Sequence, residues 1–116
     1  MVQPGAIILA GGHEVRPGCE LMDRRVLEAA GGTSARVAFL PTAVAAYDPQ
    51  GSIRGAIAYF ATLGAAAVGV PVLTREDADD PTLVAPIQQA TLIYLGGGDP
   101  GHLLTTLAGS LVWSAI

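Results

Sequence analysis

Apolar residues in this chain gather in four short runs, and longer segments with helical spacing separate them. The predicted strands lie at residues 6–11, 36–41, 67–73 and 91–96. Within each run the apolar residues follow one another without alternation, which is typical of strands buried on both faces of a parallel sheet. The predicted helices span residues 19–30, 49–63, 81–89 and 100–108. This repeated succession of strand and helix indicates an α/β fold with a mostly parallel sheet.

Three of the predicted helices begin with the same dipeptide. The pairs are Asp48-Pro49, Asp80-Pro81 and Asp99-Pro100. Each pair places a carboxylate at the N-cap and a proline at the first helical position, where no N–H is needed. Ser110 is expected to cap a further turn that begins at Leu111. Gly31 and Gly64 stand where left-handed residues end helices.

The chain of 116 residues is long enough for one domain, and we assign residues 1–116 to a single α/β domain. With 51% hydrophobic and 14% charged residues, the composition excludes an intrinsically disordered chain. An open α/β sheet usually has five or more strands, and only about four are predicted here. The apolar residues 111–116 run to the end without a polar stop. We therefore expect the natural domain to continue past Ile116, and the unpaired sheet edge favours a homo-oligomer.

Charge and cysteine content narrow the partners and the compartment. The net charge is -4, and the six basic residues, all arginine, form no run, so we expect no nucleic-acid partner. The single cysteine, Cys19, cannot form an internal disulfide, which favours a cytoplasmic protein. No basic stretch precedes the apolar segment at Ala6, so no secretory signal is predicted. The uncharged run 55–74 contains glycines and a proline, and we interpret it as a helix followed by a strand, not a membrane span.

Candidate chemistry lies in the loops that come after the strands, because ligands of open parallel sheets bind at the carboxyl ends of the strands. Three such loops are informative: Gly11-Gly12-His13-Glu14, Pro41-Thr42-Ala43, and residues 96–102, with the sequence Gly-Gly-Gly-Asp-Pro-Gly-His. The last contains G-x-G-x-x-G, but a dinucleotide site wants this motif after the first strand and an acidic residue about 20 positions later. A more general interpretation is that successive glycines before a helix leave amides exposed to a developing negative charge.

Each polar candidate also has a structural explanation. Asp99 is expected mainly as a helix cap, and His102 can point to solvent from the first helical turn. His13 and Glu14 are as consistent with a solvated loop as with a site. A metal site would need His13, Glu14 and His102 to converge, and we predict no metal and no cofactor. Ser34 follows a helix and precedes a strand, the reverse of a nucleophile elbow, so we predict a turn residue.

The order of these motifs resembles one family. The motifs are the strand and Gly-Gly-x-Glu loop at residues 8–14, the strand and Pro-Thr-Ala at 39–43, the aromatic helix ending in Leu63-Gly64, and Tyr94-Leu-Gly-Gly-Gly-Asp-Pro-Gly-His-Leu-Leu104. Together they resemble the amino-terminal half of the cyanophycinase and α-aspartyl dipeptidase family of serine peptidases. That family belongs to the class I glutamine amidotransferase-like superfamily. The resemblance implies a flavodoxin-like three-layer α/β/α fold.

The resemblance also implies roles for individual residues. Gly98 would supply a backbone N–H to the oxyanion hole, with Gly97 beside it and Asp99 next to the substrate. The substrate-binding candidates are Gly97, Asp99, Gly12, His13, Glu14 and Thr42. The family's serine lies in a later Gly-Thr-Ser-Ala-Gly elbow, with its histidine and acidic partner beyond it, and this sequence stops before all three.

Three functions therefore stand open. The first is the amino-terminal portion of a serine peptidase-like or amidase-like hydrolase of small peptides or amides, inactive by itself. The second is a non-catalytic binding or assembly module with the same fold. The third is a nucleotide or phosphate binder at residues 96–101.

Overall fold

Three parallel strands form the sheet of this chain, in a computed structural model that describes residues 5–11 and 14–116. The strands are β1 (Arg36–Leu40), β2 (Ala66–Gly69) and β3 (Leu92–Leu95), and their order is β2-β1-β3. Val37 of β1 stands opposite Ala67 on one side and Leu92 on the other. β1 is the central strand, and four of its five residues are buried. This position explains the uninterrupted apolar run of its sequence.

Six α-helices accompany the sheet within the described residues. They are α1 (Glu20–Ala29), α2 (Pro49–Thr62), α3 (Arg75–Ala78), α4 (Pro81–Gln89), α5 (Pro100–Leu107) and α6 (Leu111–Ala115). Two short 3-10 turns, η1 (Gly32–Ser34) and η2 (Thr42–Val44), lie before and after β1. None of the helices in the described part of the chain is long and apolar enough to cross a membrane.

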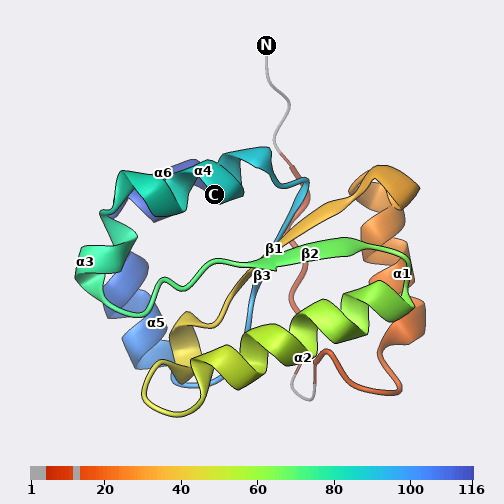
Figure 1. Cartoon of the computed structure of the whole chain (residues 1–116), viewed down its shortest axis with the longest axis horizontal. Coiled ribbons are helices and arrows are strands. Elements are labelled where there is room, and N and C mark those ends of the chain that lie inside the picture. The colour runs from red at the N-terminus through yellow and green to blue at the C-terminus, as the bar shows by residue number, and fades with distance from the viewer. Residues whose placement is uncertain (1–4, 12–13) are drawn as a thin grey trace.

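The helices divide between the two faces of the sheet. Ala38 and Leu40 of β1 pack with residues of α3 to α6, whereas Val37 and Phe39 pack with residues of α1 and α2. Alternate side chains of one strand point to opposite faces, so the central strand serves two cores. Figure 1 shows α3 to α6 gathered on one side of the strands and α1 and α2 on the other. The chain therefore has a three-layer α/β/α architecture, as predicted.

The predicted helix starts are confirmed. Asp48, Asp80 and Asp99 each accept a hydrogen bond of 2.9 Å from an amide in the first helical turn. Ser110 accepts one of 3.0 Å from Trp113 N at the start of α6. Gly31 and Gly64 have positive φ angles of 119° and 79°, which suit glycine at helix ends.

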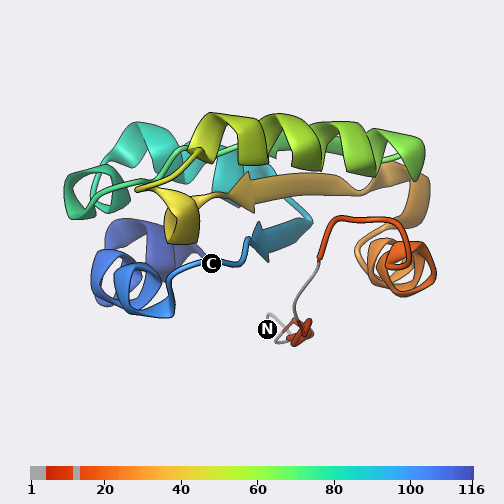
Figure 2. The same ribbon diagram turned by 90° about the horizontal axis from the view of Figure 1, so that it is seen from below.

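The first predicted strand is wrong in this structure. Residues 6–11 form no strand, so the sheet has three strands where about four were expected. The side chains of Ile7 and Leu9 are 90% and 92% exposed. These residues belong to the arm, by which we mean residues 5–11 and 14–19 before α1. In Figure 2 residues 5–11 of the arm lie outside the sheet, on the β3 side. An apolar run becomes a strand only when a neighbouring edge satisfies its amides and carbonyls, and no described strand pairs with this one.

The end of the third predicted strand also differs from the prediction. β2 ends at Gly69, although the predicted strand reached residue 73. Val70 and Val72 remain fully buried against the α4 side, which accounts for the apolar sequence beyond the strand. The short helix α3 follows and includes the acidic residues Glu76 and Asp77. Thr74 caps that helix through a reciprocal pair of hydrogen bonds with Asp77.

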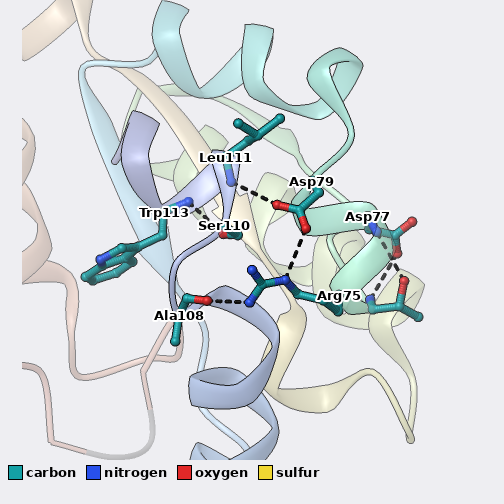
Figure 3. Close-up of polar contacts among 8 residues, drawn as sticks. Arg75, Asp77, Asp79, Ala108, Ser110, Leu111 and Trp113 are labelled. Atoms are coloured by element: carbon teal, nitrogen blue, oxygen red, sulfur yellow. Dashed lines mark hydrogen bonds and ion pairs between the residues drawn. The ribbon is translucent and has the colours of Figure 1, made fainter.

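α3 is tied to the connection between α5 and α6 by side-chain contacts (Figure 3). Arg75 Nε lies 3.1 Å from Asp79 Oδ2, and a second nitrogen of Arg75 donates to the carbonyl of Ala108. Asp79 Oδ1 accepts a hydrogen bond of 3.1 Å from Leu111 N. These contacts fix the layer of helices behind the carboxyl ends of the strands.

Candidate functional site

A cavity of about 650 Å³ lies at the carboxyl ends of β1 and β3. Its walls come from the arm before α1, from the end of β1, from α2 and from the glycine loop after β3. The lining includes Glu14, Phe39, Ser52, Gly96, Gly97 and Gly98. This is the rim at which a parallel α/β sheet binds ligands.

The glycine loop is held on one side by the turn after β1. Gly96 N donates a hydrogen bond of 3.1 Å to Leu40 O, and Asp99 N donates one of 2.8 Å to Ala43 O. Gly98 has φ +147° and lies against Ala43, where an added Cβ would overlap the Ala43 carbonyl. Glycine is therefore required here by both backbone conformation and space.

The amides of Gly97 and Gly98 have no hydrogen-bond acceptor among residues 5–11 and 14–116. Both residues line the cavity. An amide without a protein partner at a cavity wall is available to an oxygen of a bound ligand. The oxyanion-hole role of Gly98 remains a prediction, and its amide at the cavity wall, with no acceptor in the described part of the chain, leaves that role possible.

Glu14 of the arm also contacts the glycine loop, at Gly97. Its side chain is half-buried, and an added Cβ at Gly97 would overlap Glu14 Oε1. The predicted convergence of the first loop and the glycine loop on one rim is therefore observed for Glu14 and Gly97. Gly12 and His13, the other candidates of the first loop, lie outside the described residues.

The remaining candidates lie away from the cavity wall. Asp99 Oδ1 accepts hydrogen bonds from Gly101 N at 2.9 Å and His102 N at 3.2 Å, so its observed role is that of a cap. Thr42 is fully buried in η2, and its hydroxyl has no partner among the described residues. His102 Nε2 lies 2.8 Å from Leu73 O and does not point to solvent. Within the described residues no group of His, Cys, Asp and Glu side chains could hold a metal ion.

Two polar side chains of the cavity lining were missed in the sequence. Arg16 and Ser52 both line the cavity, Arg16 from the arm and Ser52 from the first turn of α2. Ser52 lies just beyond the Asp48-Pro49 cap of the helix after β1, and helix starts at the carboxyl end of a sheet face its rim. That position was a usable signal. No sequence signal indicated Arg16, because the path of the arm depends on tertiary contacts.

A buried polar group lies close to the acidic residues of the arm and α1. The hydroxyl of Tyr94 on β3 is buried and has no partner in the described part of the chain. Burial raises the pKa of this hydroxyl, and the negative charges of Asp23 and Glu14 raise it further. A phenol is already neutral at pH 7, and this shift keeps the Tyr94 hydroxyl protonated to higher pH.

The comparisons with known proteins agree with this arrangement. The family model described as "Peptidase family S51" matches residues 6–116. A comparison with curated proteins finds no match. Among solved structures, a peptidase from an acI-B1 Actinobacterium is similar over 91% of this chain, with 29% sequence identity and a TM-score of 0.80. The similar region is 46% of that protein, so the chain spans a little under half of its length. The match extends over nearly every residue, including both loops of the cavity, and the chain therefore belongs to peptidase family S51.

Proposed function

We propose that these residues form one wall of the active site of a serine peptidase-like hydrolase that acts on small peptides or amides. The cyanophycinase and aspartyl dipeptidase type is the closest description of that activity. The observation that carries the proposal is that the amides of Gly97 and Gly98, on a loop that lines the cavity, have no acceptor in the described part of the chain. In the reaction, the Gly98 N–H would donate to the oxyanion of the tetrahedral intermediate. One such donor contributes about 3–4 kcal/mol to transition-state stabilisation.

The attacking serine is proposed to lie outside this sequence. Among the serines present, Ser34 precedes β1 and is remote from the rim, and Ser110 caps α6. Ser52 lines the cavity and would need a histidine as its base. The ring of His102 is instead within hydrogen-bond distance of Leu73 O and the Thr106 hydroxyl. Nucleophilic catalysis by a serine needs a base within hydrogen-bond reach. We therefore expect no hydrolysis by the 116 residues alone.

The nucleotide alternative is weakened by the observed cap. A phosphate at residues 96–101 would use the first amides of α5, and Asp99 already accepts the amides of Gly101 and His102. A carboxylate in that position repels a second anion. The binding-module alternative keeps the same cavity and differs from the hydrolase only in the absence of a nucleophile beyond Ile116.

The decisive experiment starts from the coding sequence downstream of Ile116. If it encodes a strand and an elbow serine, the extended protein should hydrolyse aspartyl dipeptides or related amides. The substitution Gly98→Ala should then lower kcat by 100-fold or more, whereas Glu28→Ala on the exposed face of α1 should leave it unchanged. A stop codon directly after Ile116, or full activity of the Gly98→Ala protein, would exclude the proposal.

Compartment and assembly belong to the same proposal. The single cysteine, which cannot form an internal disulfide, supports a cytoplasmic location. The outer edge of β3 has no strand partner among the described residues, which supports a homo-oligomer. Light scattering of the purified chain tests the assembly, and a mass of one chain at micromolar concentration would contradict it.

A further inference from the structure

Two segments contact the glycine loop, and we call them its walls. The first is η2, and the second is the arm before α1. On the η2 side, Gly98 lies against Ala43, and Asp99 N is hydrogen-bonded to Ala43 O. On the arm side, the Glu14 carboxyl group lies against Gly97. The η2 wall is hydrogen-bonded and belongs to the packed fold. The Glu14 wall comes from a segment that has no regular structure before α1.

The backbone next to Glu14 is strained. Val15 has φ +53°, the only positive φ of a non-glycine residue among the described residues. This conformation is rare for β-branched side chains and costs about 1–3 kcal/mol, so it persists only where surrounding contacts impose it. The Val15 side chain packs against the cluster that contains Leu27, Val37 and Phe60. The arm is thus anchored in the core at Val15 while the preceding residue faces the cavity.

We propose that Glu14 is a positioning residue, which holds Gly97 and Gly98 in place at the cavity wall, where their amides have no acceptor among the described residues. The anchored Val15 fixes the direction of the Glu14 side chain, and the carboxyl group closes the space into which Gly97 would otherwise move. The loop is then restrained from both sides, although its own glycines allow wide conformational freedom. The inference rests on the proposed function in one respect only, which is the use of the two amides in binding an oxyanion.

The test measures backbone order by ¹⁵N relaxation in the 116-residue chain and needs no catalysis. In the unmodified chain the order parameters of Gly97 and Gly98 should be those of rigid backbone, about 0.85, and in Glu14→Ala they should fall below about 0.6. Glu14→Gln keeps the size and polarity of the side chain and should retain the rigid values. Glu28→Ala removes the same charge from the exposed face of α1 and is the matched control.

Two results would overturn the inference. Unchanged order at Gly97 and Gly98 in Glu14→Ala would show that the η2 wall suffices. An equal loss of order in Glu14→Gln would show that charge, not a packed side chain, restrains the loop. Should Glu14→Ala fail to fold, Gly97→Ala tests the contact from the other side, and rigid values at Glu14 and Val15 in that variant would equally overturn it. Either failure leaves the hydrolase proposal standing, and absence of hydrolysis in an extended protein leaves this measurement unaffected.

Discussion

The hydroxyl of Tyr59 donates a hydrogen bond of 2.5 Å to Oδ2 of Asp23 and so joins α2 to α1. Asp23 is only 2% exposed, and no arginine of the described residues lies within ion-pair distance of it. A buried carboxylate without a cation depends on such donors for its stability. The contact therefore fixes α1 on the face of the sheet that α2 also covers. In the chain, α1 follows the arm that carries Glu14.

Removing the Tyr59 hydroxyl should destabilise the chain. In Tyr59→Phe the buried Asp23 loses its donor, and an unsatisfied buried group of this kind costs about 1–3 kcal/mol. Tyr94→Phe is the matched control, because the Tyr94 hydroxyl has no partner in the described residues. That variant should keep or slightly raise the free energy of unfolding, as measured by urea denaturation. Equal losses in the two variants would contradict the assigned role.

Stability should fall at alkaline pH. Burial raises the pKa of Tyr59, and its hydrogen bond to Asp23 adds to the shift; burial also raises the pKa of Tyr94. Because the folded-state pKa values exceed the unfolded value of about 10, this stability is complete below pH 10 and is lost as the pH rises above it. Denaturation midpoints between pH 8 and 12 should show the decline. Tyr59→Phe should flatten it, and an unchanged slope would be inconsistent with this assignment.

Asp79 should matter at neutral pH and cease to matter in acid. The hydrogen bond from Leu111 N, together with that from Arg75, lowers the pKa of this carboxyl. A lowered folded-state pKa gives stability that is present above the unfolded value of about 4 and is lost as the pH falls through the folded value. Asp79→Ala should therefore lower the thermal midpoint at pH 7 and have little effect near pH 2. Glu76→Ala in α3, the helix that Asp79 follows, is the control, and a midpoint change that persists in acid would argue against the mechanism.

Two glycine substitutions should change stability in opposite directions. Gly98→Ala places a side chain at φ +147° and against Ala43, and strain of this kind costs about 1–3 kcal/mol. Gly55 lies in α2 with open space around its added Cβ, so Gly55→Ala should stabilise the chain by about 1 kcal/mol. Urea denaturation of both variants measures the difference. A neutral Gly98→Ala would mean that the loop is free to move.

The cap of α5 should be worth about 1 kcal/mol. Asp99→Ala removes the acceptor of the Gly101 and His102 amides, and losing an N-cap side chain costs about that much. Asp99→Asn keeps an acceptor oxygen and should recover most of the loss. Titration with inorganic phosphate should show no binding by the unmodified chain. Saturable millimolar binding would revive the phosphate alternative.

The rim of the sheet was largely predictable, whereas the first strand was not. The parallel sheet is expected from uninterrupted apolar runs, and the carboxyl ends of parallel strands share one edge, so the loops at residues 11–14 and 96–102 could be expected to lie on one rim. Residues 6–11 carry the same apolar signal as β1. Pairing, however, is a property of two segments, and the sequence of one run does not contain the position of its partner.

Among the site residues, too, local properties were predictable and properties set by packing were not. Asp99 was predicted to be a cap because capping is local, and the structure confirms it. Thr42 was predicted at the substrate, yet its burial in η2 depends on how that turn packs against the rest of the fold. Arg16 lines the cavity because the chain turns at the strained Val15, and no local sequence pattern predicts a positive φ at a β-branched residue.

The sequence by itself determined the α/β class, the helix starts and the glycine loop, because periodicity, capping and glycine conformation act over a few neighbouring residues. Only the tertiary structure decided that residues 6–11 pair with no described strand, that Glu14 faces Gly97, and which amides have no acceptor within the part of the chain that the structure describes. Those properties depend on distances between segments far apart in the chain, and packing alone sets such distances.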